Sequence, residues 1–283
     1  MREPVDATTK GVLRPAETAA AAHLRRDHPV SDALRPFVER YWSVRWDRTA
    51  QSPFTTEVLS HPSVNVSVEQ GSHPRFGVSM PAVLLHGVVT HRFSVDLVGS
   101  GRVTAVKFRP GGFTALTGSA PPRDSVSPLG ERLGVAAGTV AAAVLADEDD
   151  GARAAALDAV LTPLAREPAT IYIDLLDLLE QMACDRTLLR VDDVAARAGT
   201  TVRSLQRLFA TYVGVGPKAV LARYRLQDAV DSIDRGGTTD LAGLAASLGW
   251  FDQAHFSRDF RDVVGMTPSA YARRATSFSA PSG

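Results

Sequence analysis

The sequence predicts an α+β chain: a β-rich, barrel-like N-terminal domain, a helical linker and a C-terminal all-α domain with two helix-turn-helix units. Three observations predict it. Short alternating apolar runs occupy residues 36–109, alanine- and leucine-rich runs lie within residues 126–186, and the last third of the chain holds one pattern twice. A length of 283 residues suits two domains.

The expected boundaries follow these changes in composition. The first 25 residues, with Ala19–Ala22 among scattered charges, favour a flexible or marginally helical tail. The full division is a tail over 1–25, a β-rich domain over 26–125, a helical linker over 126–174, an all-α domain over 175–274 and a tail over 275–283.

Composition excludes several classes of protein. Apolar residues make up 45% and charged residues 22% of the chain, as in ordinary soluble proteins. No run of about 18 apolar residues and no apolar signal core occurs, so we expect neither membrane insertion nor export, and a cytoplasmic location. Cys184 is the only cysteine, which excludes an intramolecular disulfide and a cysteine zinc cluster, and we expect it in the core.

The β-rich region consists of short runs separated by Gly, Pro, Ser and His. Alternation of apolar and polar residues is clearest at Val64, Val66 and Val68, as expected for antiparallel strands in a small barrel or sandwich. The predicted strands are Tyr41–Trp46, Val64–Val68, Gly77–Val78, Val83–Leu85, Gly87–Val89, Phe93–Leu97 and Val103–Phe108.

A barrel of this size could hold one small molecule between aromatic walls. The alternative is that its aromatic residues only fill the core. His61, His86 and His91 raise the question of a metal, but four residues separate His86 from His91, which places them on opposite faces of a regular strand. We therefore assign no metal site and no cofactor. The candidate ligand contacts are Tyr41, Trp42, Trp46, Phe93 and Phe108, with Arg109 as an anchor for an anionic ligand.

Three helical runs form the linker and the start of the last domain: Ala136–Ala146, Ala152–Leu164 and Ile171–Met182. An acidic turn, Asp147–Gly151, separates the first two. In the third run Ile171, Leu175, Leu178, Leu179 and Met182 form one apolar stripe. These helices either mediate dimerisation or pack the two domains together.

The repeated pattern lies in the last third of the chain. Val194–Gly199 matches Leu244–Gly249 at an offset of 50, whereas Arg207, Phe209, Gly214 and Pro217 match Arg258, Phe260, Gly265 and Pro268 at an offset of 51. Each copy indicates a short helix, a turn at glycine and a second amphipathic helix, which is the arrangement of a helix-turn-helix.

In the first copy we expect Asp192 or Asp193 to cap the opening helix and Gly199 to adopt a left-handed turn. A second helix, from about Val202 to Tyr212, follows the caps Thr200 and Thr201. Its buried side is expected to be Leu205, Leu208, Phe209 and Tyr212, and its outward side Arg203, Gln206, Arg207 and Ala210.

In the second copy Asp240 is the expected cap, Gly249 the turn and Asp252 the start of the second helix. The inward residues are Phe256, Phe260 and Val263 or Val264, and the outward ones Gln253, Ala254, His255, Ser257 and Arg258. Between the copies, a helix from Pro217 to about Ile233 spans roughly 25 Å, near the separation of successive major grooves, about 34 Å.

The chemistry of the outward faces favours DNA, because arginine pairs with guanine and glutamine with adenine. The alternative for each arginine is a solvated helix face. Residues 187–274 hold 12 Lys and Arg against 9 Asp and Glu, a net charge of +3, which indicates few phosphate contacts beyond these faces and a moderate salt dependence.

Residues 175–274 resemble the AraC/XylS-type DNA-binding domain, above all in Ala195–Gly199, Arg203–Phe209, Gly249–Arg261 and Gly265–Tyr271. The resemblance implies a transcriptional regulator, with double-stranded DNA as partner. Ala254 departs from the long polar side chain often found there, so the second helix is expected to read fewer bases. The base-facing residues it implies are Arg203, Gln206, Arg207, Gln253, Ala254, His255 and Arg258; Ser257 joins them from the helical pattern.

The Phe108–Phe113 turn and His61-Pro62 are similar to the N-terminal module, cupin-like or uncharacterised, of some AraC-type regulators. This similarity implies a sensor domain for a small-molecule effector. Two alternatives stay open: a ligand-independent regulator whose N-terminal domain only oligomerises, and a cupin-like enzyme with a DNA-binding appendage, for which no catalytic residues are found. Contact with RNA polymerase, and a monomer or homodimer, are also open.

Overall fold

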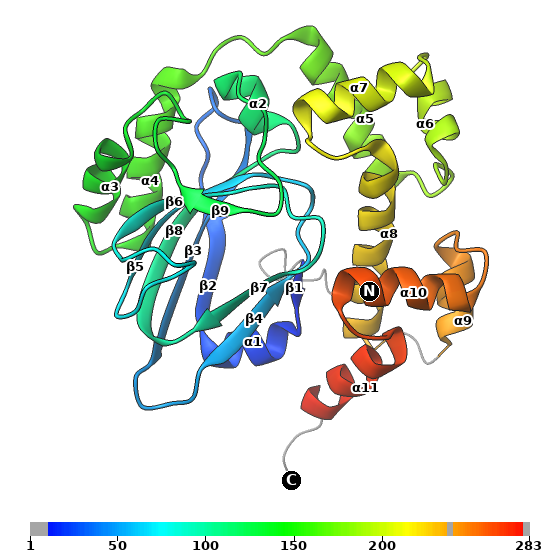
Figure 1. The fold of residues 1–283 in the computed structure, drawn as a ribbon, viewed down its shortest axis with the longest axis horizontal. Coiled ribbons are helices and arrows are strands. Elements are labelled where there is room, and N and C mark those ends of the chain that lie inside the picture. Colours follow the sequence, from blue (N-terminus) through cyan, green and yellow to red (C-terminus); the bar gives the residue numbers. More distant parts are fainter. Residues whose placement is uncertain (1–10, 237–239, 280–283) are drawn as a thin grey trace.

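The computed structural model describes residues 11–236 and 240–279. Its N-terminal part contains two antiparallel sheets (Figure 1). The larger has the order β2-β3-β8-β5-β6-β9, and the smaller has the order β1-β4-β7. The strands are β1 (Val12–Leu13), β2 (His23–His28), β3 (Val38–Arg48), β4 (Phe54–Val58), β5 (Asn65–Gly71), β6 (Ala82–His86), β7 (Phe93–Leu97), β8 (Gly99–Phe108) and β9 (Val126–Pro128).

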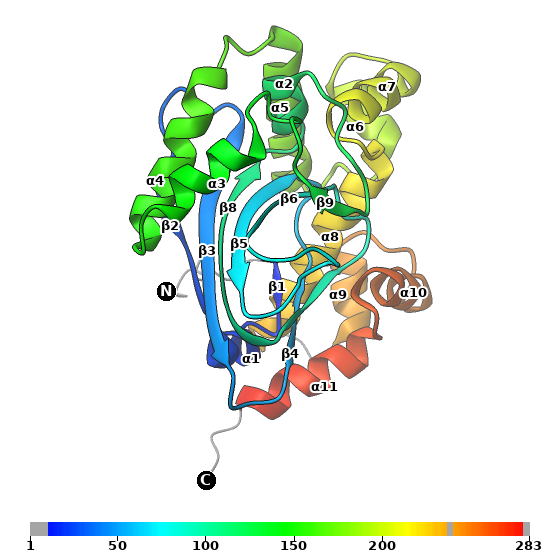
Figure 2. The same ribbon diagram turned by 60° about the vertical axis from the view of Figure 1, so that its left-hand side comes forward.

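The two sheets face each other without joining into one closed barrel, so the domain is barrel-like, as predicted. Figure 2 shows the larger sheet curving, with α3 (Ala137–Leu145) and α4 (Asp150–Leu161) on one of its faces. Strand alternation explains the two faces: Val66, Val68 and Val106 are buried in the helix-covered core, while the neighbouring positions face the smaller sheet.

Several strand predictions need correction. Gly77–Val78 and Gly87–Val89 are not strands, and Val78 and Val88 each make only an isolated bridge. β2 and β4 were not predicted, because neither His23–His28 nor Phe54–Val58 shows a run of apolar residues. β9 lies in the segment predicted as linker but pairs with β6.

The prediction of a tail over residues 1–25 is wrong for residues 11–25. Val12 and Leu13 form β1, pair with Val58 and Glu57, and are buried. α1 (Pro15–Ala21) follows, and β2 begins at His23. Residues 1–10 lie outside the described part of the chain. At the other end, α11 (Pro268–Ser279) includes residues 275–279, which were also predicted as tail, while residues 280–283 are outside the description.

The remaining helices are α2 (Gly112–Thr117), a 3-10 helix (Thr162–Leu164), α5 (Thr170–Cys184), α6 (Val191–Arg197), α7 (Val202–Tyr212), α8 (Pro217–Asp234), α9 (Leu241–Ser247) and α10 (Gln253–Val264). In α5 the predicted stripe is buried except Ile171, which is 52% exposed because Tyr172 fills the core at the first turn. Cys184 is also exposed, contrary to expectation, since it lies two residues beyond the buried Met182 and faces another direction.

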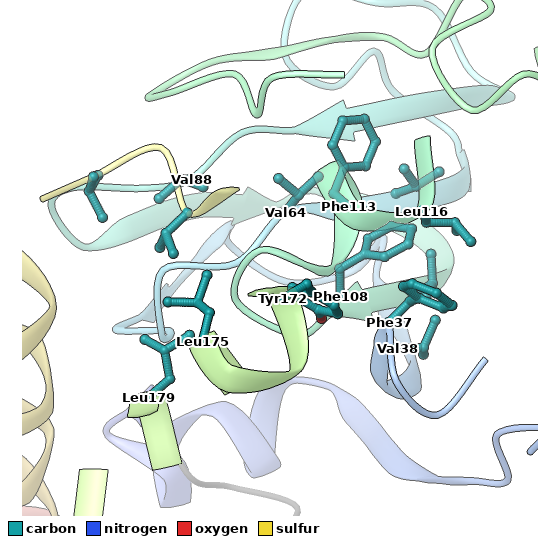
Figure 3. Packing of buried hydrophobic residues seen from close by; sticks show 14 of the residues in the cluster. Phe37, Val38, Val64, Val88, Phe108, Phe113, Leu116, Tyr172, Leu175 and Leu179 are labelled. Atoms are coloured by element: carbon teal, nitrogen blue, oxygen red, sulfur yellow. The ribbon is translucent and has the colours of Figure 1, made fainter. Parts of the chain in front are cut away.

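Two apolar cores hold the C-terminal helices differently. The larger core runs from the main sheet through Phe37, Phe108, Tyr172 and Leu175 (Figure 3) to α7 and the start of α8. The smaller core holds α9, α10, α11 and the end of α8, and it includes Leu13 and Leu59 from the N-terminal domain. Over the described residues, no helix has the length and apolar character needed to cross a membrane.

Candidate nucleic-acid interface and sensor cavity

Local capping starts the second helix of each helix-turn-helix unit where the sequence predicts; these two helices, α7 and α10, are called the recognition helices, after their place in the motif. The Thr201 hydroxyl accepts a hydrogen bond from the backbone N–H of Ser204 at 3.2 Å, which begins α7. The Asp252 carboxylate accepts one from the backbone N–H of His255 at 2.6 Å, which begins α10. Gly199 and Gly249 adopt φ angles of 60° and 81°, the left-handed turn expected between the helices.

The caps of the two opening helices differ. Asp240 caps α9 as predicted, since its Oδ1 accepts from the backbone N–H of Gly243 at 2.9 Å. In α6 neither predicted aspartate is the N-cap. Asp193 lies in the first turn and its Oδ2 accepts from the backbone N–H groups of Leu189 and Arg190, at 3.2 and 2.8 Å.

α7 presents one apolar and one polar face. Leu205 and Phe209 are buried, whereas Arg203, Gln206 and Arg207 are exposed. The predicted outward set of this helix therefore lies together on its solvent side.

α10 repeats this division. Phe256, Phe260 and Val264 are buried. His255 Nε2 lies 3.3 Å from Asp259 Oδ2, one turn further along the same helix. The same carboxylate oxygen accepts a hydrogen bond from the Trp250 indole at 2.9 Å. Gln253, Ala254, His255 and Arg258 are exposed, while Ser257 is half-buried.

The N-terminal domain contacts both recognition helices at their carboxyl ends. The Thr114 hydroxyl donates to the backbone carbonyl of Tyr212, at 3.2 Å. The backbone N–H of Arg92 donates to the carbonyl of Val263, at 3.0 Å. Tyr212 and Val263 occupy the same position in the two copies, 51 residues apart. The amino-terminal halves, with the predicted DNA contacts, are left open.

A glycine follows each of these contacts at another equivalent position. A Cβ on Gly214 would lie 2.7 Å from the ring of Pro121, and a Cβ on Gly265 would lie 1.3 Å from a guanidinium nitrogen of Arg92. Both glycines have positive φ angles, 82° and 85°. Each one therefore ends its segment in a left-handed turn and makes room for the N-terminal domain.

A cavity of about 390 Å³ lies between the two sheets. Its apolar wall comes from both sheets and from the N-terminal segment. One of its lining residues, Gln227, belongs to α8, the helix that connects the two helix-turn-helix units. The apolar lining residues are Val12, Ala22, Leu24, Trp42, Val44, Val58, Phe76, Val89, Phe93, Val95, Leu97 and Val103.

Charged side chains line one region of the cavity. Glu39 and Arg40 both line it because the pairing of β3 with β8 shifts between Val38 and Arg40, which breaks the strand alternation. Glu39 contacts Arg40 at 2.6 Å and Lys107 at 2.9 Å. Burial acts to raise the pKa of Glu39, but the two cations outweigh it and lower the pKa to about 2.

A second polar group surrounds Glu69. Its Oε1 accepts from the Ser67 hydroxyl at 2.7 Å and lies 3.3 Å from His86 Nε2, and its Oε2 accepts from Arg75 Nε at 2.5 Å. Burial alone would raise the pKa of Glu69, but the hydrogen bond with His86 and the charge of Arg75 hold it below its usual value. The Arg75 guanidinium lies over the Trp46 ring, 4.7 Å from its centroid.

Of the six predicted effector contacts, Trp42 and Phe93 line the cavity. Tyr41 and Phe108 lie in the helix-covered core, because they alternate with cavity-facing residues. Trp46 is buried beside the cavity, with its indole N–H on the carbonyl of Val98 and its ring beside Gly101. Arg109 donates instead to the carbonyl of Arg35, at 2.8 Å.

The three histidines weighed as metal ligands do not form one site. His61 and His86 line the cavity, while His91 is exposed. Within residues 11–236 and 240–279 no group of three or more His, Cys, Asp or Glu side chains is arranged to hold a metal ion.

Comparison with known proteins follows the same division of the chain. Residues 194–274 match the family described as Helix-turn-helix domain, and residues 26–124 match the Domain of unknown function (DUF6597). A putative AraC-like transcription regulator of Streptomyces lividans is 34% identical over 86 residues, which cover 30% of this chain and 28% of that protein. The uncharacterized HTH-type transcriptional regulator YidL of Escherichia coli is 35% identical over 80 residues, or 28% of this chain and 27% of that protein. The chain therefore spans less than a third of the length of these relatives.

Two solved structures also match this chain. An AraC-type transcriptional regulator from Chromobacterium violaceum covers 39% of this chain and 96% of its own, with 25% identity and a TM-score of 0.34. ToxT from Vibrio cholerae O395 covers 90% of this chain and 97% of its own, with 12% identity and a TM-score of 0.41. The chain therefore combines a C-terminal helix-turn-helix domain, similar to that of AraC-like transcription regulators, with a DUF6597 module ahead of it.

Proposed function

We propose that this protein is a sequence-specific regulator that reads two adjacent major grooves of DNA with α7 and α10. The observation that carries the proposal is the matching exposure of the two helices: each presents its amino-terminal polar face to solvent while its carboxyl end is held by the N-terminal domain. α8, with 18 residues, spans about 27 Å between the units. That length is near the separation of successive major grooves, about 34 Å.

Each exposed side chain has a role that fits its chemistry. Arg203, Arg207 and Arg258 can each donate two hydrogen bonds to guanine, and Gln206 and Gln253 can pair with adenine, with about 1–3 kcal/mol of discrimination for each good pair. Ala254 offers only a methyl group, which suits the methyl of thymine. We assign His255 and Ser257 to the rim of the second contact, because His255 neighbours Asp259 and Ser257 is half-buried.

Selection of bound sequences from a random duplex library tests this reading. The full-length protein should enrich two short motifs about one helical turn of DNA apart, near 34 Å. Arg207→Ala and Arg258→Ala should each relax selection at one motif and weaken specific binding far more than nonspecific binding. Arg235→Ala is the matched control, since Arg235 is an exposed arginine of the same domain outside both recognition helices. Equal losses of specific and nonspecific binding would contradict base readout.

The cavity between the sheets is the proposed effector site. Its volume, about 390 Å³, suits one small molecule. The cavity is lined by three cationic side chains, Arg40, Arg75 and Lys107, and by two carboxylates, Glu39 and Glu69. A surplus of positive charge within apolar walls favours an amphipathic ligand that is neutral or carries one negative charge, and disfavours a cation.

Three probes with one chain length and different head groups test this site: decanoate, decanol and decylamine. Thermal unfolding of the full-length protein should shift upward with decanoate, less with decanol and not with decylamine. Phe93→Ala should reduce the shift, whereas Arg109→Ala, outside the cavity, should leave it unchanged. No shift with any probe, in a protein that still selects DNA motifs, would favour the alternative in which the N-terminal domain only assembles the chain.

A further inference from the structure

The three-stranded sheet β1-β4-β7 lies between the larger sheet and the second helix-turn-helix unit (Figure 1), and we call it the partition. One face lines the cavity, with Thr56 and Val58 from β4 and Phe93 and Val95 from β7. Leu13 of β1 instead packs into the small core with α8, α9 and α10. Because side chains alternate along a strand, the same short strands contact both the cavity and the second unit.

Arg92, the residue before β7, makes polar contacts that join this partition to α10. Its backbone N–H donates to the carbonyl of Val263 at 3.0 Å, and its guanidinium donates to the carbonyl of Val264 at 2.9 Å. A cation at the carboxyl end of a helix is favourable, because the last carbonyls lack partners within the helix. Gly265 follows directly, and any Cβ there would occupy the place of the guanidinium.

Glu57 orients Arg92 from the neighbouring strand. Its Oε1 accepts from Arg92 Nε at 2.6 Å, and its Oε2 accepts from the guanidinium of Arg14 at 2.7 Å. Glu57 is 8% exposed and Arg14 is buried as well, whereas the Arg92 side chain is 35% exposed, so the ion network is buried around Glu57 and partly open to solvent at Arg92. Its neighbours along β4, Thr56 and Val58, both line the cavity.

The segment that leads into Arg92 is bound to α8. Arg223, 4% exposed, donates to the backbone carbonyls of Val89, Thr90 and His91. The side chain of Val89 lines the cavity. Residues 89–92 therefore touch the cavity and α8 at one end and α10 at the other.

The first unit is held in another way. Thr114, which donates to Tyr212, comes from α2, and α2 belongs to the large core on the helix-covered face of the main sheet. Among the described residues that line the cavity, none comes from α2 or α7. Phe93, Thr56 and Val58 line the cavity and adjoin Arg92 and Glu57 in the chain, whereas no residue adjoining Thr114 or Pro121 lines it. The second recognition helix is therefore the more directly connected to the cavity.

We propose that Arg92 and Glu57 are positioning residues for α10, and that a molecule in the cavity acts through them on the second recognition helix rather than the first. This inference rests on the proposed function, since it assumes that α10 reads DNA. A ligand that displaces the partition would change the equilibrium between orientations of α10, and thereby the affinity for one half-site only.

Footprinting of the full-length protein on a duplex with both half-sites tests the positioning role. Arg92→Ala should weaken protection of the half-site read by α10 about tenfold, or roughly 1.4 kcal/mol, and leave the half-site read by α7 unchanged. Arg92→Lys should recover part of this loss, because a lysine can still donate to the last carbonyls of α10. Arg132→Ala, an exposed arginine of the same domain, is the matched control.

Two cavity-filling variants test the route. Val95→Phe fills the cavity from the partition and should alter only the second half-site, whereas Val44→Phe fills it from the main sheet and should alter neither, with thermal unfolding used to confirm that both are folded. Equal effects of Arg92→Ala on both half-sites, or no effect on either, would overturn the inference while leaving DNA reading intact. Failure of the unmodified protein to protect any duplex would instead refute the proposed function.

Discussion

The two helix-turn-helix units share a sequence pattern and a fold but differ in what holds them. The core of the first unit continues into the main sheet, so Phe209 shares one apolar cluster with Phe108. The core of the second unit is separate and takes only Leu13 and Leu59 from the N-terminal domain. Polar contacts of Arg92 with α10 and of Arg14 with Tyr271 add to this attachment. Duplicated units can therefore diverge through their attachments while their folds stay alike.

The largest expected effect tests this difference in attachment. Phe209 and Phe260 are equivalent and fully buried, so replacing either by alanine should cost about 3–5 kcal/mol. Phe209→Ala should destabilise the whole protein, whereas Phe260→Ala should open the second unit first. Hydrogen exchange, read segment by segment, separates the two outcomes. Equal loss of protection across the chain in both variants would contradict the idea of two separate cores.

The turn glycines give a second, smaller comparison. Gly199 and Gly249 both have positive φ angles, but a Cβ on Gly199 would meet nothing within 4 Å, whereas one on Gly249 would lie 2.5 Å from Leu189. Gly199→Ala should cost about 1 kcal/mol for its backbone conformation. Gly249→Ala should cost about 0.5–1.5 kcal/mol more, because the exposed Leu189 side chain must also change its rotamer. Urea unfolding measures both, and equal costs would show that Leu189 yields freely.

The smallest effect concerns a carboxylate of the second unit. Asp234, at the end of α8, accepts a hydrogen bond from the Tyr271 hydroxyl at 3.1 Å, and the backbone N–H of Arg14 donates to the same hydroxyl oxygen at 3.2 Å. Burial raises the pKa of Asp234 from 3.8 to about 6, despite the hydrogen bond from Tyr271. The folded state therefore binds more protons between these values, and the free energy of unfolding falls as pH rises through this window.

Asp234→Asn removes the charge but keeps an acceptor for Tyr271. The variant should match the unmodified protein near pH 4 and exceed its free energy of unfolding by about 1–2 kcal/mol above pH 6. Unfolding measured at several pH values checks this, with Asp262→Asn, at an exposed aspartate of the same domain, as the control. A stability difference that does not change with pH would show that the pKa of Asp234 is not raised.

The helical units could be predicted because their signals are local. Thr201, Asp240 and Asp252 cap helices that begin one residue later, and Gly199 and Gly249 turn where predicted. Capping and turn geometry depend on residues within about one turn of each other, so the sequence pattern determines them.

The cavity could not be predicted in the same way. Whether Tyr41 or Trp42 lines the cavity depends on which face of β3 meets the smaller sheet. That sheet contains β4, whose sequence has no apolar run from which a strand could be predicted. A shift in pairing brings Glu39 and Arg40 to the same side, which a regular alternation would not allow. Gln227 reaches the cavity only because α8 packs against the loop that holds Leu59, a contact 168 residues apart in the chain.

The glycines that follow the two recognition helices limit which other N-terminal domains could be fused to this DNA-binding domain. Gly214 and Gly265 each receive a side chain of the N-terminal domain in the space where a Cβ would otherwise lie. A chimera that joins this DNA-binding domain to a different sensor would therefore lack the side chains of Pro121 and Arg92 and leave the spaces beside Gly214 and Gly265, here called the two sockets, unfilled. Grafting should succeed when the incoming domain also presents a ring and a guanidinium at these points, and compatibility at the two sockets should matter more than the length of the linker.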